Sequence, residues 1–446
     1  MGRRFFIRTY GCQMNGHDSE LMESILLDHG FLRADSEDAA SVVILNTCSV
    51  REQAERKAIG RLQALAWRKA AEKNFYFGVA GCMAQNLGKE LFCRVPALDF
   101  AIAPGRIRSV AEVLKRLENG EKQIFLPNEE GETFVNGSID FCRRKITRVS
   151  AFVSIANGCN MNCSYCIVPK TRGREVCRSM DSILREVQFL VEKGVSEVTL
   201  GGQIVNFYGI RKIPFVNGKS PFVQLLEKVH AVDGLERIRF LSPHPSGFRD
   251  DLIDCYANLP KLCPHVHFPI QSGSDRVLRA MRRPYTRQMA LNVLHKLRRN
   301  VSLMAISTDL IVGFPGETEE DFRQTEQLFD EIDFDMAFVF KYSPRAGTQA
   351  AAMDNQIPGS VCEERNQILL KKLAVTSLRR NQLFLNSQQP VLVEAPSTKD
   401  PRVLWGYTPH HKKVFFSASE KLIGKIVPVK ISYITTCALN GVLENG

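Results

Sequence analysis

The sequence lacks any apolar run that approaches the roughly 18 residues of a membrane-spanning helix, which excludes a helical membrane protein. It also lacks an early apolar segment long enough for a signal peptide, since the stretch at residues 5–7 is only three residues long. Internal repeats and low-complexity tracts are absent as well. We therefore expect a cytoplasmic protein that does not associate with membranes.

The composition excludes global disorder, because 44% of the 446 residues are hydrophobic and 24% are charged. At roughly 150 residues per domain, the length suggests about three domains. The net charge is +11, and residues 378–446 contribute 9 basic against 4 acidic side chains. This excess favours a polyanionic partner, most simply nucleic acid, although a merely basic surface would have the same composition.

The first third alternates short apolar runs with amphipathic helical patterns, which is typical of an open parallel α/β sheet. The strand patterns lie at 5–11, 41–46 and 75–81, and the helical patterns at 16–29 and 51–71. We assign residues 1–118 to this domain. Residues 119–144 interrupt the pattern with Gly-, Asn- and Glu-rich segments, and we interpret them as a connector.

Residues 145–377 contain six strand patterns with helical patterns between them, which predicts a partial (β/α) barrel. The segment is shorter than the roughly 250 residues of a full eight-stranded barrel. Residues 378–446 show about five short strand patterns with Gly and Pro turns, and predict a small closed β-barrel similar to oligonucleotide-binding barrels. The predicted fold class is thus α/β, with an open parallel-sheet N-terminal domain, a partial barrel core and a C-terminal β-barrel.

Three of the 13 cysteines form the pattern C-x3-C-x2-C at Cys159, Cys163 and Cys166, just after the first strand of the predicted partial barrel. Three thiolates can hold three irons of an iron–sulfur cubane and leave the fourth iron open. Zinc is the alternative, but it usually takes four ligands in two pairs, and the sequence has no second C-x2-C. Active sites of such barrels gather in the loops at these strand ends.

Cys12, Cys48 and Cys82 follow one another at intervals of 36 and 34 residues, each near the carboxyl end of a predicted strand. In a parallel sheet these ends share one edge, where ligands bind, so the three side chains could meet in a second metal site. A single cysteine in such a place is more often part of the core. We assign the other seven cysteines to packing.

The C-x3-C-x2-C motif, with Tyr165 before its last cysteine, resembles the radical S-adenosylmethionine superfamily. Both cysteine sets together resemble the methylthiotransferases, in particular the MiaB-type tRNA branch, over nearly the whole chain. The matching segments are TYGCQMN, NTCSVRE, AGCMAQ, GCNMNCSYCIVPKTRGRE, QSGSDRVLRAM, DLIVGFPGETEEDF and YSPRAGT. The tail resembles the RNA-binding TRAM domain.

The resemblance implies two [4Fe-4S] clusters, one on each cysteine set, with S-adenosylmethionine as cofactor. It implies insertion of a methylthio group at C2 of N6-isopentenyladenosine beside the anticodon, so that the partner is the anticodon stem-loop of tRNA. No catalytic residue is implied beyond the cluster ligands. An electron donor such as flavodoxin or ferredoxin and a monomeric enzyme are further expectations.

Polar residues at other strand ends are candidates for contacts to S-adenosylmethionine. We expect such contacts from Gln203 and Asn206 in LGGQIVNFYG, and from Ser272 and Ser274 in QSGSD. A structural turn is the alternative for the first pair. A helix N-cap is the alternative for the second pair.

The tail supplies candidate RNA contacts, because charge next to aromatic residues suits phosphate binding and base stacking. We expect them at Lys412, Lys413, Arg379 and Arg380, with a solvated barrel face as the alternative. The segment WGYTPHHKK replaces the Arg- and Asn-rich stretch usual in the family, which leaves the RNA contacts to be determined.

Two classes of alternative function remain open, a related enzyme and a non-catalytic protein. Related branches act on threonylcarbamoyladenosine of tRNA or on an aspartate of a ribosomal protein, and TYGCQMN favours the isopentenyladenosine branch over both. A non-catalytic iron–sulfur RNA-binding protein would also explain the basic tail, but it would not cleave S-adenosylmethionine.

Overall fold

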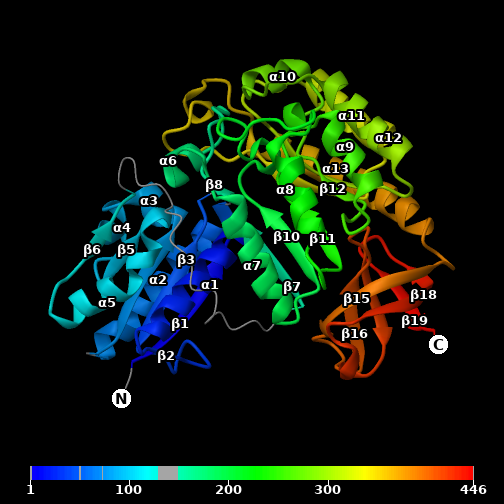
Figure 1. The fold of residues 1–446 in the computed structure, drawn as a ribbon. Helices are drawn as coiled ribbons and strands as arrows, with labels where there is room; N and C mark the ends of the chain where they lie inside the picture. Colours follow the sequence, from blue (N-terminus) through cyan, green and yellow to red (C-terminus); the bar gives the residue numbers. More distant parts are fainter. Residues whose placement is uncertain (1–2, 50–51, 73, 129–148, 445–446) are drawn as a thin grey trace. The chain divides into compact units, whose positions relative to one another are not determined.

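The computed structural model describes residues 3–49, 52–72, 74–128 and 149–444 (Figure 1). The chain forms two compact units. The first contains Met1–Lys145, Ala156–Asn162 and Cys166–Ser182, and the second contains Ile146–Ile155, Cys163–Tyr165 and Ile183–Gly446. Among the described helices, none has the combination of length and apolarity that crossing a bilayer requires.

The first unit is built on a parallel sheet with the strand order β2-β1-β3-β4-β5-β6 among the described residues. The strands are β1 (Arg4–Tyr10), β2 (Leu32–Arg33), β3 (Val42–Thr47), β4 (Tyr76–Gly81), β5 (Phe100–Ile102) and β6 (Ile124–Leu126). From β1 the chain moves outward to β2 and then returns to the other side at β3. This reversal creates a topological switch point between the carboxyl ends of β1 and β3, where ligands bind in such sheets.

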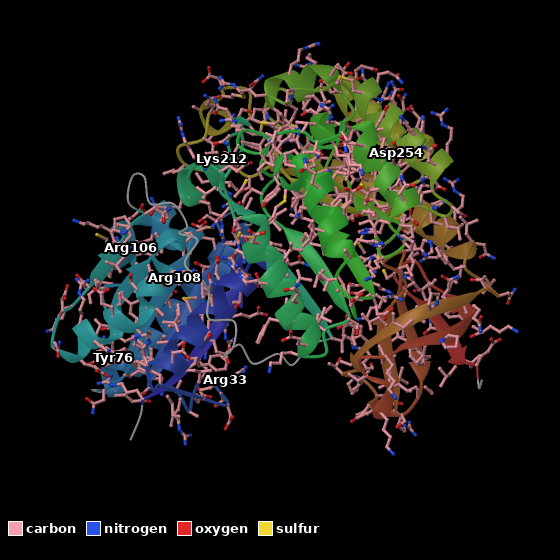
Figure 2. The ribbon with its side chains drawn as sticks, in the orientation of Figure 1. Arg33, Tyr76, Arg106, Arg108, Lys212 and Asp254 are labelled. Atoms are coloured by element: carbon pink, nitrogen blue, oxygen red, sulfur yellow. The ribbon has the colours of Figure 1, made fainter. Side chains whose placement is uncertain are left out.

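Helices cover both faces of this sheet. They are α1 (Gln13–Asp28), α2 (Glu52–Ala71), α3 (Cys82–Leu87), α4 (Glu90–Arg94), the 3-10 helix η1 (Pro104–Ser109) and α5 (Val110–Glu118). One apolar core joins α1 and α5 to the sheet, and another joins α2, α3 and α4. Figure 2 shows Arg106 and Arg108 of η1 at the carboxyl edge of the sheet, and Tyr76, the first residue of β4, at the opposite edge.

The predicted parallel sheet is confirmed, but it extends further along the chain than expected. β6 pairs with β5 from Phe100↔Ile124 to Ile102↔Leu126. These residues lie within 119–144, the segment that the sequence predicts to be a connector, so the connector prediction is wrong for β6. The three-residue strand was too short to give a sequence pattern of its own, and residues 129–148 lie outside the described part of the chain. The first unit also takes in β8 (Ala156–Asn157), α6 (Val168–Arg172) and β9 (Val176–Cys177).

The second unit contains the predicted partial barrel as two parallel three-stranded sheets, β11-β10-β7 and β12-β13-β14, within the described residues. A parallel bridge between Ile238 and Leu262 connects them. The strands are β7 (Ser150–Ser154), β10 (Glu197–Gly201), β11 (Arg237–Phe240), β12 (His265–His267), β13 (Ala305–Val312) and β14 (Met336–Lys341).

Helices follow the strands, as in other (β/α) arrangements. They are α7 (Met180–Glu192), α8 (Pro221–His230), α9 (Asp250–Asn258), α10 (Asp275–Ala280), α11 (Arg287–Asn300), α12 (Glu319–Ile332) and α13 (Gly359–Gln382), with 3-10 turns η3 (Val205–Phe207), η4 (Pro245–Gly247) and η5 (Ala350–Ala352). The predicted domain boundary between 377 and 378 falls inside α13. One continuous helix therefore leads from the partial barrel to the tail.

The tail forms the predicted closed β-barrel, with the order β15-β16-β17-β19-β18 in residues 388–443, all of which are described. The strands are β15 (Gln388–Pro396), β16 (Val403–Tyr407), β17 (Lys413–Ser417), β18 (Ile426–Ile434) and β19 (Leu439–Leu443), with η6 (Glu420–Leu422) between β17 and β18. Alternate residues such as Leu404, Val414 and Val429 are fully buried and fill the barrel interior.

Two arginines of β11 fasten the C-terminal barrel to the partial barrel. Arg237 donates to the carbonyl oxygens of Tyr407 and Pro390 at 2.8 and 2.7 Å. Arg239 donates to those of Pro409 and Thr408 at 2.9 and 2.8 Å. The Nε of Arg239 also lies 2.8 Å from a carboxylate oxygen of Glu197. All three charged side chains are buried, so the turn between β16 and β17 is fixed by strong, charge-assisted hydrogen bonds.

A second carboxylate holds the same turn. Asp335, which precedes β14, lies 2.7 Å from the Nζ of Lys412 and 3.3 Å from the Nε of Arg380. His411, the neighbour of Lys412, stacks on His265 of β12 with 4.8 Å between the ring centroids. The segment 408–412 therefore belongs to the junction between the two barrels.

Replacement Glu197→Gln tests this junction. It should lower the free energy of unfolding by about 3 kcal/mol, because two buried arginines would lose their carboxylate. Trp405 fluorescence during urea unfolding would measure the effect in a Trp67→Phe background, since the chain has only 2 tryptophans. The exposed neighbour Glu236→Gln is the matched control. Equal stabilities for the two variants would contradict the role of Glu197.

Candidate functional site

The parallel register of the first unit places the first cysteine set at one edge of the sheet. Cys12 follows β1 and begins α1, Cys48 directly follows β3, and Cys82 directly follows β4. β1, β3 and β4 are neighbours in the sheet, and the backbone N–H of Cys48 donates to the carbonyl of Tyr10 at 2.9 Å. The predicted meeting of these strand ends is therefore present in the fold.

The thiols of this set share one electrostatic environment. A side-chain hydrogen bond with Cys48 lowers the pKa of Cys12 to about 6, and the charge of Arg172 acts in the same direction. Arg172 interacts electrostatically with Cys82 as well as with Cys12. A thiolate is the form that binds metal, so this environment suits a metal-ligating set. Within the described residues, no three His, Cys, Asp or Glu side chains are arranged for a single metal ion.

Two buried asparagines shape the loops that carry these cysteines. The Nδ2 of Asn15 donates to Asn46 Oδ1 at 3.2 Å, and the Nδ2 of Asn46 donates to the carbonyl of Asn15 at 2.7 Å. Asn15 Oδ1 also accepts hydrogen bonds from the backbone N–H and the thiol of Cys12, both at 3.3 Å. The pair thus connects the first turn of α1 to the end of β3.

Gly81, just before Cys82, completes this packing. Its φ of 92° is in the left-handed region that favours glycine. A Cβ atom here would lie 2.5 Å from Asn46 Oδ1 and 2.6 Å from the carbonyl oxygen of Thr47. The third cysteine loop can therefore approach the asparagine pair only with glycine at this position.

Arg172 of α6 reaches the first cysteine set from the segment that follows the second set in sequence. Its guanidinium lies 2.6 Å from the Asp18 carboxylate and donates to Asn157 Oδ1 at 3.3 Å. The Arg172 and Asp18 side chains are only 3% and 4% exposed, so this ion pair is fully buried. Its charge is therefore balanced within the first unit.

The second cysteine set lies between β8 and α6. The backbone N–H of Met161 donates to Cys159 Sγ at 3.3 Å. In the second unit, Arg283 donates to Cys163 Sγ, also at 3.3 Å. Hydrogen-bond donors aimed at sulfur suit anionic thiolates, and three cysteines fit a cluster with one iron left open. The donor set thus fits the iron–sulfur cluster expected from the sequence.

Three of the four candidate contacts to S-adenosylmethionine already have hydrogen-bond partners within the protein. Ser274 caps α10 by accepting from Val277 N and donates to Asp321 at 2.6 Å, as in the N-cap alternative. Ser272 contacts Thr325 at 3.3 Å. Asn206 uses both ends of its amide to hold the backbone of His244.

Gln203, just beyond β10, differs from these three residues. Its Oε1 is buried and has no hydrogen-bond partner among the described residues. A buried acceptor without a partner is costly, which suits a position that contacts a ligand. Of the four predicted contacts, only Gln203 has this property.

Of the four candidate RNA contacts, two are buried in ion pairs and two keep access to solvent. Lys412 and Arg380 are buried against Asp335, and burial lowers the pKa of Lys412. They fasten the barrel and do not present charge to a solvent-borne ligand. Arg379 remains exposed beside Asp333, and Lys413 lies over the Trp405 ring at 4.2 Å from its centroid.

Replacement Asn46→Ala tests the asparagine pair. It should leave Asn15 without its buried partner, at a cost of about 1–3 kcal/mol, and so reduce the iron held by the first cysteine set. The measurement is iron per chain after anaerobic reconstitution, in a full-length background with Cys159, Cys163 and Cys166 replaced by Ala. Ser19→Ala removes the 2.9 Å bond to Asn46 and a 2.7 Å contact with the Thr9 hydroxyl but leaves the asparagine pair intact, and it serves as control. Unchanged iron in Asn46→Ala would refute the assignment.

Comparisons with known proteins agree with this organisation. The family model for the radical SAM superfamily matches residues 153–329, that for "Uncharacterized protein family UPF0004" matches 4–103, and that for the TRAM domain matches 382–443. A solved structure of TsrM from Kitasatospora setae, a radical S-adenosylmethionine methyltransferase, is similar in fold, with a TM-score of 0.57 and 15% identity. The similarity covers 79% of this chain and 77% of that one.

Curated relatives match along the whole chain. A protein of Opitutus terrae is 45% identical over 99% of this chain and 97% of its own length, and one of Akkermansia muciniphila is 43% identical over 98% of each. Both are named tRNA-2-methylthio-N(6)-dimethylallyladenosine synthase. With its two cysteine sets, partial barrel and C-terminal barrel, the chain belongs to the tRNA-2-methylthio-N(6)-dimethylallyladenosine synthase family of radical SAM enzymes.

Proposed function

We propose that this protein is a tRNA methylthiotransferase that inserts a methylthio group at C2 of N6-isopentenyladenosine beside the anticodon. The observation that carries the proposal is the presence of two separate three-cysteine sets in one chain, each at strand ends. A sensor or structural protein would need only one such set. Full-length relatives named for this reaction support the same conclusion.

The chain's own residues divide the work between the two sets. Cys12, Cys48 and Cys82 would hold one [4Fe-4S] cluster, and Cys159, Cys163 and Cys166 the other. When bound, the clusters and S-adenosylmethionine supply the radical and sulfur chemistry. Gln203 would contact S-adenosylmethionine through its buried Oε1. Electrons would come from a flavodoxin or ferredoxin, and we propose a monomeric enzyme acting in the cytoplasm.

The outer face of β16 and β17 would bind the RNA. Trp405 pairs in register with Phe415, and Tyr407 with Lys413, while the alternate residues fill the barrel interior. The rings of Trp405, Tyr407 and Phe415 are half-buried, which leaves surface for stacking on unpaired bases. Lys413 supplies charge among them. Arg379 of α13, which is exposed and paired with Asp333, is a further candidate contact.

Nucleoside mass spectrometry tests the reaction. In a host without its own methylthiotransferase, this gene should convert N6-isopentenyladenosine of tRNA to its 2-methylthio form. The purified Cys48→Ala chain should still cleave S-adenosylmethionine but make no methylthio product, whereas Cys163→Ala should do neither. Cys93→Ala, which alters an exposed cysteine outside both sets, is the control. Full product from Cys48→Ala, or unmodified tRNA with the wild-type gene, would contradict the proposal.

Replacement Lys413→Gln tests the RNA face. It should weaken binding of an anticodon stem-loop several-fold and reduce the slope of log affinity against log salt by about 1, because one phosphate contact is lost. Fluorescence anisotropy at several salt concentrations measures both quantities. Lys430→Gln removes an equal charge from exposed β18 and should have a smaller effect. An equal loss in both variants would show that the RNA face lies elsewhere on the barrel.

A further inference from the structure

Arg283 approaches the second cysteine set from a distant part of the sequence. It lies between α10 and α11, 120 positions from Cys163, and its NH1 group donates to Cys163 Sγ at 3.3 Å. Its Nε donates to the hydroxyl of Tyr285 at 3.0 Å, and its NH2 donates to the carbonyl of Pro269 at 3.4 Å. The three bonds use separate nitrogens, so the orientation of the guanidinium toward the sulfur is fixed.

The partners of Arg283 supply no compensating carboxylate. Within the described residues, its hydrogen-bond acceptors are a phenol, a peptide carbonyl and the sulfur, and no ion pair includes it. The Tyr285 hydroxyl is itself committed, since it donates to the carbonyl of Ile270 at 2.8 Å. Arg283 is half-buried, and its guanidinium is directed at Cys163 Sγ. When the three cysteines hold a cluster, the negative charge of the thiolate-bound cluster would face this cation.

The first cysteine set differs in this respect. Its arginine, Arg172, lies 2.6 Å from Asp18, and both side chains are buried, so the pair adds no net charge. The second set therefore faces an arginine that has no carboxylate partner among the described residues, whereas the effect of Arg172 on Cys12 is partly offset by Asp18. Net charge and hydrogen bonds to sulfur are among the factors that set the reduction potential of an iron–sulfur cluster.

We propose that Arg283 is a positioning residue that raises the reduction potential of the cluster held by Cys159, Cys163 and Cys166. The inference rests on the cluster assignment in the proposed function. Reduction adds one electron, taken from a flavodoxin- or ferredoxin-class donor, and makes the thiolate-bound cluster more negative. The fixed positive charge and the N–H···S bond stabilise that reduced state more than the oxidised one.

The test is the midpoint potential of this cluster in full-length protein with Cys12, Cys48 and Cys82 replaced by Ala, measured by anaerobic redox titration with EPR detection. Arg283→Gln should reduce the equilibrium constant for reduction about tenfold, a shift of about 59 mV to more negative potential for a one-electron couple. Arg283→Lys keeps the charge and should give an intermediate value. Arg282→Gln removes an equal charge from the exposed neighbouring position and should match the parent.

A second measurement separates this role from a structural one. With a weak reductant, the Arg283→Gln protein should cleave S-adenosylmethionine more slowly than the parent, and titanium(III) citrate should restore the rate. If Arg283→Gln alone fails to bind the cluster while Arg283→Lys binds it, the requirement for charge is also supported.

Three outcomes would overturn the inference. The first is an unchanged midpoint potential in Arg283→Gln, and the second is an equal shift in Arg282→Gln. The third is loss of the cluster from both Arg283→Gln and Arg283→Lys, which would indicate that the site needs the shape of the arginine side chain and not its charge. The wild-type product assay is separate from this titration. Missing product together with a shifted potential would refute the proposed function and leave the role of Arg283 intact.

Discussion

The parallel pairing of β1, β3 and β4 is the constraint on which the first cysteine set depends. Parallel strands end at the same edge, so residues more than thirty positions apart in sequence reach one place without any long loop. The loops at that edge must still turn sharply. The Asn15–Asn46 pair satisfies their polar groups, and Gly81 allows the close approach of the third loop. Strand register, the asparagine hydrogen bonds and the backbone conformation of Gly81 thus together determine where the three cysteines lie.

Electrostatic compensation organises the rest of the chain. Thiolates and buried carboxylates each require opposite charge nearby, and arginine is the residue that most often provides it here. Arg172 and Arg283 do so for the cysteine sets, while Arg237, Arg239 and Arg380 do so around Glu197 and Asp335. Arg237, Arg239, Arg283 and Arg380 also donate to backbone carbonyls, so they fix loops as well as balance charge.

The sequence was sufficient to predict what depends on local patterns. Alternating apolar runs located the parallel sheets and the closed barrel, and cysteine spacing placed Cys12, Cys48 and Cys82 at neighbouring strand ends. It could not predict pairs that only the fold brings together. Cys163 and Arg283 are 120 positions apart, and nothing near either residue signals the other. Lys412 was expected to contact RNA because a lysine beside aromatic residues has the same sequence pattern whether it faces solvent or a buried Asp335.

The contacts that hold the β16–β17 turn restrict which C-terminal barrels this core can accept. Arg239 donates hydrogen bonds to the carbonyl oxygens of Thr408 and Pro409, and Asp335 pairs with the side chain of Lys412. The barrel and the core are therefore held together by specific contacts from both sides. A barrel transplanted from a relative with a different turn would leave Arg239 without the carbonyl oxygens that it contacts here, and Asp335 would lose the ammonium group of Lys412. We therefore expect a chimera of two relatives to keep this junction only if the WGYTPHHKK turn and the core residues that bind it come from the same parent.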